Sequence, residues 1–88
     1  MASKRLLKRD VNYVMGDIIE AAYVHQLANP KQDPQKTEEI VEEAIATFDE
    51  LIAKINQKDV ENKKQHFKGI ETELETKANA LVDKINAL

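Results

Sequence analysis

The residues that could do chemistry in this chain are few and far apart. The sequence contains two histidines, one serine at Ser3 and no cysteine. A hydrolase needs its nucleophile held against a base, and we expect the chain start to fray around Ser3. The missing cysteines exclude thiol nucleophiles, disulfides and zinc–thiolate sites. We therefore predict a protein that is not an enzyme, with no catalytic, cofactor-binding or metal-binding residues and no cofactor.

The two histidines lack the spacing of a metal-binding bundle. A di-iron carboxylate bundle places a glutamate three residues before a histidine on each of two helices. Ala22 stands at that distance before His25, and Lys63 before His66. We expect His25 at a helix end, where the helix dipole favours it when protonated, and His66 at the edge of an apolar stripe. Whether either has a role beyond structure stays open at this point.

Other chemical and targeting signals are also missing. Neither glycine lies between a strand and a helix, so no phosphate-binding loop can be drawn. No apolar run approaches the roughly 18 residues of a membrane-spanning helix. The basic start is not followed by the apolar stretch of a signal peptide. We expect a cytoplasmic protein with no membrane association, and we infer no small-molecule substrate.

The elements that must position any site are helices. The chain of 88 residues has only two glycines and two prolines, which argues against an all-β fold rich in tight turns. Apolar residues instead recur at helical spacing. The spacing predicts helices at about 4–28, 34–56 and 60–87. Short links make such helices antiparallel neighbours, so we predict an all-α, up-down-up antiparallel three-helix bundle, with residues 1–88 as a single domain.

Each predicted helix has one apolar stripe that should face the core. In the first helix the stripe is Leu7, Val11, Val14, Met15, Ile18, Ala22 and His25. In the second it is Val41, Ala44, Ile45, Phe48, Leu51, Ile52 and Ile55. In the third it is Val60, Phe67, Ile70, Leu74, Ala78, Leu81, Ile85 and Leu88.

Capping residues mark the helix starts. Ser3 and Asp33 are expected to cap the first and second helices, and either Asp59 or Asn62 the third. Gly69 costs about 1 kcal/mol relative to alanine inside a helix and could mark a break. The apolar stripe keeps its phase across Gly69, so we predict one continuous third helix.

One basic cluster stands at the start of the first helix. It consists of Lys4, Arg5, Lys8 and Arg9. Such a cluster could touch phosphates, and a small nucleic-acid-associated regulator is the alternative function. The net charge of −3 argues against a nucleic-acid partner, because a few phosphate contacts give only weak, salt-sensitive binding.

A second apolar line on the first helix is the best functional lead. Leu6, Tyr13, Val24 and Leu27 share one side of the helix, far from the main stripe, and Glu20 interrupts them. They could belong to a wide core arc, or they could form a protein-contact surface. We predict a helical module that acts through protein–protein contact, with a protein partner or a homodimer as the two forms of that contact.

The first residues resemble a known group of proteins. The segment from Ser3 to Tyr13, SKRLLKRDVNY, is similar to the start of small bacterial helical proteins that have no assigned function. The resemblance implies a stand-alone bacterial protein with no catalytic residues to transfer. It points to Asn12 and Tyr13 as residues of interest.

Overall fold

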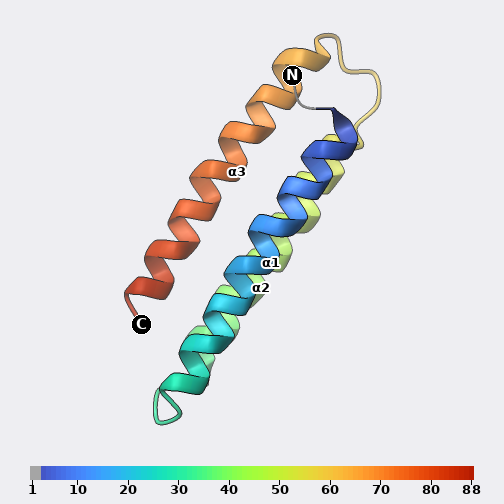
Figure 1. The fold of residues 1–88 in the computed structure, drawn as a ribbon. Helices are drawn as coiled ribbons and strands as arrows, with labels where there is room; N and C mark the ends of the chain where they lie inside the picture. The colour runs from blue at the N-terminus through green and yellow to red at the C-terminus, as the bar shows by residue number, and fades with distance from the viewer. Residues whose placement is uncertain (1–2) are drawn as a thin grey trace.

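The structure, a computed structural model, describes residues 3–88. It contains three helices, α1 (Lys4–Ala28), α2 (Pro34–Ile55) and α3 (Lys63–Asn86), which include 83% of the described residues. The helices run up, down and up, and each packs against both others (Figure 1). The predicted all-α, antiparallel three-helix bundle is confirmed.

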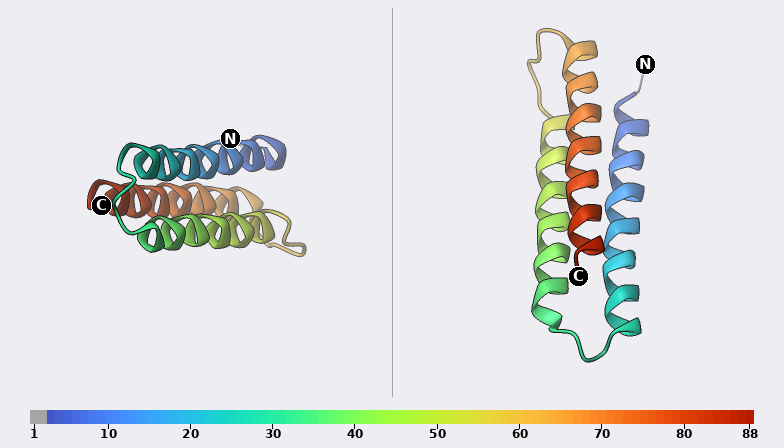
Figure 2. Two further views of the ribbon diagram at one scale, coloured as in Figure 1. Left: turned by 90° about the horizontal axis from the view of Figure 1, so that it is seen from below. Right: turned by 90° about the vertical axis from the view of Figure 1, so that its left-hand side faces the viewer.

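The bundle is a narrow rod of about 50 × 18 × 18 Å. Helix α3 is shifted along the rod towards the end where α1 begins, so the chain stops short of the α1–α2 loop (Figure 2). The starts of α1 and α3 therefore lie at the same end of the rod. Residues that are distant in sequence become neighbours at that end.

The first two helices begin where their capping residues predict. The Ser3 hydroxyl oxygen accepts a hydrogen bond from the Leu6 amide at 3.1 Å. The Asp33 carboxylate accepts one from the Gln35 amide at 3.0 Å. Each bond satisfies an amide that has no partner within its helix. The sequence alone thus located both helix starts.

The third helix begins later than the predicted residue 60. Asn62 is its cap and accepts a hydrogen bond from the Gln65 amide at 3.1 Å. Asp59, the other candidate cap, lies in the loop with a φ of 61°, a left-handed conformation that aspartate tolerates. Val60 is therefore a half-buried loop residue and not part of the helical stripe. Past this start, α3 runs through Gly69 without a break, as predicted.

The core lies along the rod axis and takes one stripe from each helix. Its buried apolar residues are Leu7, Val11, Met15, Ile18, Ala22, Ile40, Val41, Ala44, Leu51, Ile55, Ile70, Leu74 and Leu81. Phe48 and Phe67 are half-buried and pack against this cluster. The stripe of α1 matches its prediction closely.

The predicted stripe of α2 needs three corrections. The stripe includes Ile45, which is 48% exposed. It omits Ile40, which is buried in the core, and the buried threonines Thr37 and Thr47. Most neighbouring buried positions on α2 are three or four residues apart, as on one side of a helix, and both threonines fall in this phase. The Thr37 hydroxyl donates a hydrogen bond to the Gln26 side-chain oxygen at 2.8 Å, which compensates for its burial.

Candidate protein-contact surface

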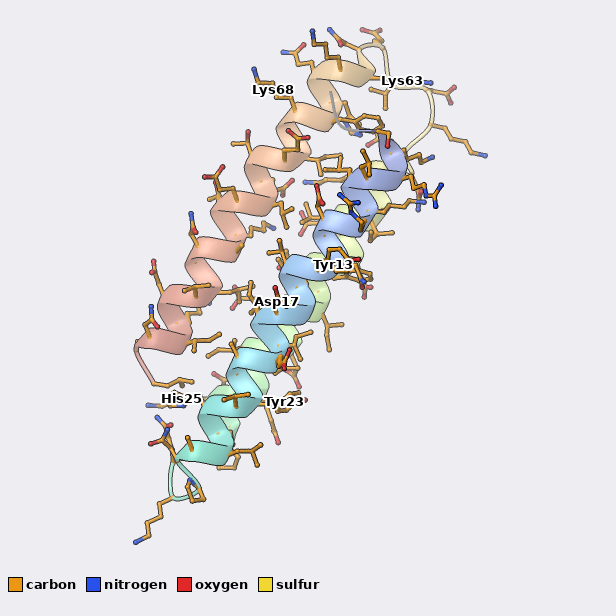
Figure 3. The ribbon with its side chains drawn as sticks, viewed as in Figure 1. Tyr13, Asp17, Tyr23, His25, Lys63 and Lys68 are labelled. Atoms are coloured by element: carbon orange, nitrogen blue, oxygen red, sulfur yellow. The ribbon has the colours of Figure 1, made fainter. Side chains whose placement is uncertain are left out.

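The second apolar line of α1 lies on the outside of the bundle. The exposed fractions are 42% for Leu6, 62% for Tyr13, 56% for Val24 and 81% for Leu27. In Figure 3, Tyr13 lies on the side of α1 that faces away from α3. The interpretation as a wide core arc is therefore wrong, because all four side chains remain accessible to a partner.

The exposure follows from the register of α1. The helix buries the stripe that contains Leu7, Val11 and Met15. Leu6 and Tyr13 are seven residues apart, and Leu27 follows after two further steps of seven. Seven residues make almost two full turns, so these side chains share one direction. We call this set, Leu6, Tyr13, Val24 and Leu27, the outer line of α1.

The exposed apolar surface continues beyond the outer line. Tyr23 on α1 and Ile45 on α2 are also large and exposed. Between the two helices lies an apolar groove of about 170 Å³, lined by Asn12, Met15, Gly16, Ile19, Ile45 and Phe48. The sequence prediction does not include Tyr23. The residue lies seven positions after Gly16, so it shares the direction of that glycine, which borders the outer line. The prediction also does not include the groove, because it assigns Ile45 to the core.

The seam between α2 and α3 has the opposite character. Lys54 Nζ lies 2.8 Å from a Glu73 carboxylate oxygen, and Lys77 Nζ lies 3.0 Å from one of Glu50. The hydrogen bond from Lys77 lowers the pKa of Glu50, and the bond to Glu73 raises the pKa of Lys54. No ion pair joins α1 to either neighbour within residues 3–88. Charged side chains therefore form ion pairs across the α2–α3 seam, whereas the outer side of α1 exposes several large apolar side chains and makes no ion pair with a neighbouring helix in the described chain.

Neither histidine belongs to a cluster of candidate ligands. His66 Nε2 is 2.7 Å from the backbone oxygen of Lys54, so the ring ties the start of α3 to the end of α2. His25 is half-buried on the α3 side of α1 (Figure 3), and its Nδ1 has no hydrogen-bond partner in the described part of the chain. Among residues 3–88, no three histidine, aspartate or glutamate side chains form a group that could hold a metal ion.

The fold gathers basic residues that the sequence separates. Lys58, Lys63, Lys64 and Lys68 lie at or after the α2–α3 loop, close to the end of the rod where α1 begins. Lys4 and Lys63 border one cavity of about 330 Å³. Segments 3–9 and 58–68 together carry eight of the 13 lysines and arginines but only two acidic residues. We call these two segments the basic end; sequence reasoning recognised only the part on α1.

The remaining chain is strongly acidic, with 14 of the 16 aspartates and glutamates. Four of them, Glu38, Glu39, Glu42 and Glu43, occupy the first turns of α2, towards the opposite end of the rod. The molecule is therefore electrostatically polar along its length. This asymmetry restricts how a charged partner can align with the rod.

Two further findings concern membrane-spanning helices and similarity to known proteins. Within residues 3–88, no helix combines the length and the apolar character needed to cross a membrane. No family model, curated protein or solved structure matches the chain.

Proposed function

We propose that this protein is a non-enzymatic helical module, located in the bacterial cytoplasm, that acts by binding another protein through the outer side of α1. This side consists of the outer line and Tyr23. One observation carries the proposal. Of the seven large apolar residues that are exposed in the described chain, five belong to α1: Leu6, Tyr13, Tyr23, Val24 and Leu27. Exposed leucine and tyrosine side chains gathered on one helix are typical of a protein-contact site.

The composition of this side supports contact with a protein surface. Tyrosine is enriched at the centres of protein interfaces, where its ring is buried and its hydroxyl finds a partner. Asp17 and Glu20 lie beside Tyr13 on the exposed side of the helix. They give the surface a mixture of apolar and charged side chains, as reversible interfaces have.

The proposal can be tested by site-specific photocrosslinking in living cells. A photoreactive phenylalanine analogue at position 13 should form a covalent adduct with a protein when the cells are illuminated. The matched control carries the same analogue at position 82, because Val82 is an exposed apolar residue on α3. Adducts at 13 but not at 82 support the proposal. Equal yields at both positions, or none at either, would refute it.

A second candidate function is contact with nucleic acid through the basic end. The observation in its favour is that Lys58 and Lys63 border the same cavity as Lys4 in the basic start of α1. Several lysines and arginines on one surface can bind phosphates through counterion release. The net charge of −3 and the acidic body of the rod oppose this binding.

We expect no measurable binding to duplex DNA or single-stranded RNA at about 0.15 M salt, where charge interactions extend roughly 8 Å. Fluorescence anisotropy with labelled oligonucleotides measures this directly. Micromolar binding that is lost in Lys63→Glu/Lys64→Glu would favour the second candidate over the first. The control pair Lys36→Glu/Lys84→Glu changes the charge equally, away from the basic end.

A further inference from the structure

We propose that the partner of the outer side of α1 is α1 of a second copy, in antiparallel orientation, which would make the functional unit a twofold-symmetric dimer. This inference depends on the proposed function and identifies the partner. It follows from the spacing of the exposed residues, from the position of Gly16 and from the distribution of charge.

The exposed residues of α1 have the spacing of a pairing seam, that is, a line of side chains along which one helix contacts a second helix. Leu6, Tyr13, Glu20 and Leu27 repeat every seven residues. Arg9, Gly16 and Tyr23 alternate with them, so the steps along the seam are three and four residues. This alternation keeps one line of side chains facing a second helix along its whole length. The 25 residues of α1 provide a seam of roughly 37 Å at 1.5 Å per residue.

The seam is complementary to itself when one copy is reversed. If Leu6 is placed at the level of Leu27 of the second copy, Tyr13 falls at the level of the second copy's Glu20. The tyrosine hydroxyl can then donate a hydrogen bond to the carboxylate, a charge-assisted bond. Glu20, which interrupts the apolar line within one chain, thereby gains a partner across the interface.

Gly16 lies at the centre of this arrangement. A Cβ atom built on Gly16 meets nothing within 4 Å, so packing inside the monomer does not require glycine there. A mid-helix glycine costs about 1 kcal/mol relative to alanine. Close approach of two helix backbones at the point where they cross gives this glycine a structural purpose.

Charge selects the antiparallel orientation over the parallel one. The first turns of α1 carry Lys4, Arg5, Lys8 and Arg9, whereas its second half carries Asp17 and Glu20. Reversal places these four residues at the level of residues 24–29 of the second copy, which contain no lysine or arginine, while a parallel pair would place the two basic clusters together. In this register Asp17 lies at the level of Gly16 of the second copy, one position from that copy's Asp17, so the two like charges near the centre weaken the dimer and favour reversible association.

The absence of cysteine from the chain makes the orientation directly testable. The variants Leu6→Cys and Leu27→Cys are prepared separately and then mixed under mild oxidation. The antiparallel dimer brings position 6 of one copy to position 27 of the other. We expect disulfide dimers in the mixture at a yield at least tenfold above that of either variant alone.

A matched control measures random collision. Val82 and Leu6 are both 42% exposed, so Val82→Cys mixed with Leu27→Cys gives the background yield. Efficient self-crosslinking of Leu6→Cys would indicate a parallel pair and would overturn the inference. Background yields in every mixture, together with a monomeric mass across a concentration series, would also overturn it.

The two proposals fail in different ways. Photocrosslinking at position 13 to a different protein, with no disulfide dimer above background, would support the contact function and refute the dimer. Photocrosslinking to a second copy, together with the 6-to-27 disulfide, supports both. No adduct at position 13 would refute the contact function itself.

Discussion

Leu51→Ala should reduce the free energy of unfolding by about 2–5 kcal/mol, as truncation of a buried leucine generally does. Leu51 is 0% exposed and belongs to the core stripe in the last turns of α2. A small domain has about 5–15 kcal/mol in total. The variant is therefore expected to lose a large part of its stability, measurable as a lower urea midpoint with an unchanged slope.

Ile45→Ala on the same helix is the matched control for Leu51→Ala. Ile45 is half exposed, so removal of its side chain takes away little buried area, and we expect a loss of about 1 kcal/mol or less. Equal losses for the two variants would place Ile45 in the core, as its position in the sequence stripe suggested. A negligible loss for Leu51→Ala would contradict the observed register of α2.

The double change Tyr13→Glu/Val24→Lys should abolish self-association while leaving the helices folded. Both side chains are exposed in the monomer, and surface substitutions usually change stability by about 0.5 kcal/mol or less. In the proposed dimer, the new glutamate faces Glu20 of the second copy, and the new lysine lies at the level of its Arg9. We expect the dissociation constant to rise at least about tenfold, equivalent to about 1.4 kcal/mol.

Two measurements on this variant separate the possible explanations. A thermal melt should lie within about 2–4 °C of the unmodified protein, since 1 kcal/mol corresponds to roughly 4–8 °C in a domain of this size. Analytical ultracentrifugation should show a monomer at concentrations where the unmodified protein associates. Val82→Lys, an exposed position on α3, should change neither result. Unfolding of the double variant would instead mean that Tyr13 and Val24 are buried, because unpaired buried charge is very costly.

The proposed contact surface consists of residues that the fold leaves uncovered. The α2–α3 seam is covered by the ion pairs of Lys54 and Lys77, whereas Leu6, Tyr13 and Leu27 face solvent. Exposure of such residues is unfavourable for a monomer, and association removes that unfavourable exposure. The proposed dimer would also give Gly16 and Glu20 a role, since packing inside the monomer does not require glycine at position 16.

The sequence by itself determined the helices, most of their ends and their order in the bundle. These features depend on local rules, since capping by Ser3 and Asp33 and the period of the α1 stripe involve residues within a few turns. The outer line of α1 was also visible in the sequence, because helix geometry fixes the direction of Tyr13 relative to Leu7. The exposure of the outer line could only be proposed from the sequence. The period of the apolar residues does not show how much of the α1 surface the two neighbouring helices cover.

Only the tertiary structure decided the properties that depend on how far two helices are shifted or rotated against each other. The packing of α3 against α1 places Lys63 and Lys4 around one cavity at the basic end. The rotation of α2 exposes Ile45 and buries Thr37, since a position on an apolar stripe is buried only where a neighbouring helix covers it. These offsets result from packing among residues far apart in the chain, and local sequence patterns do not encode them.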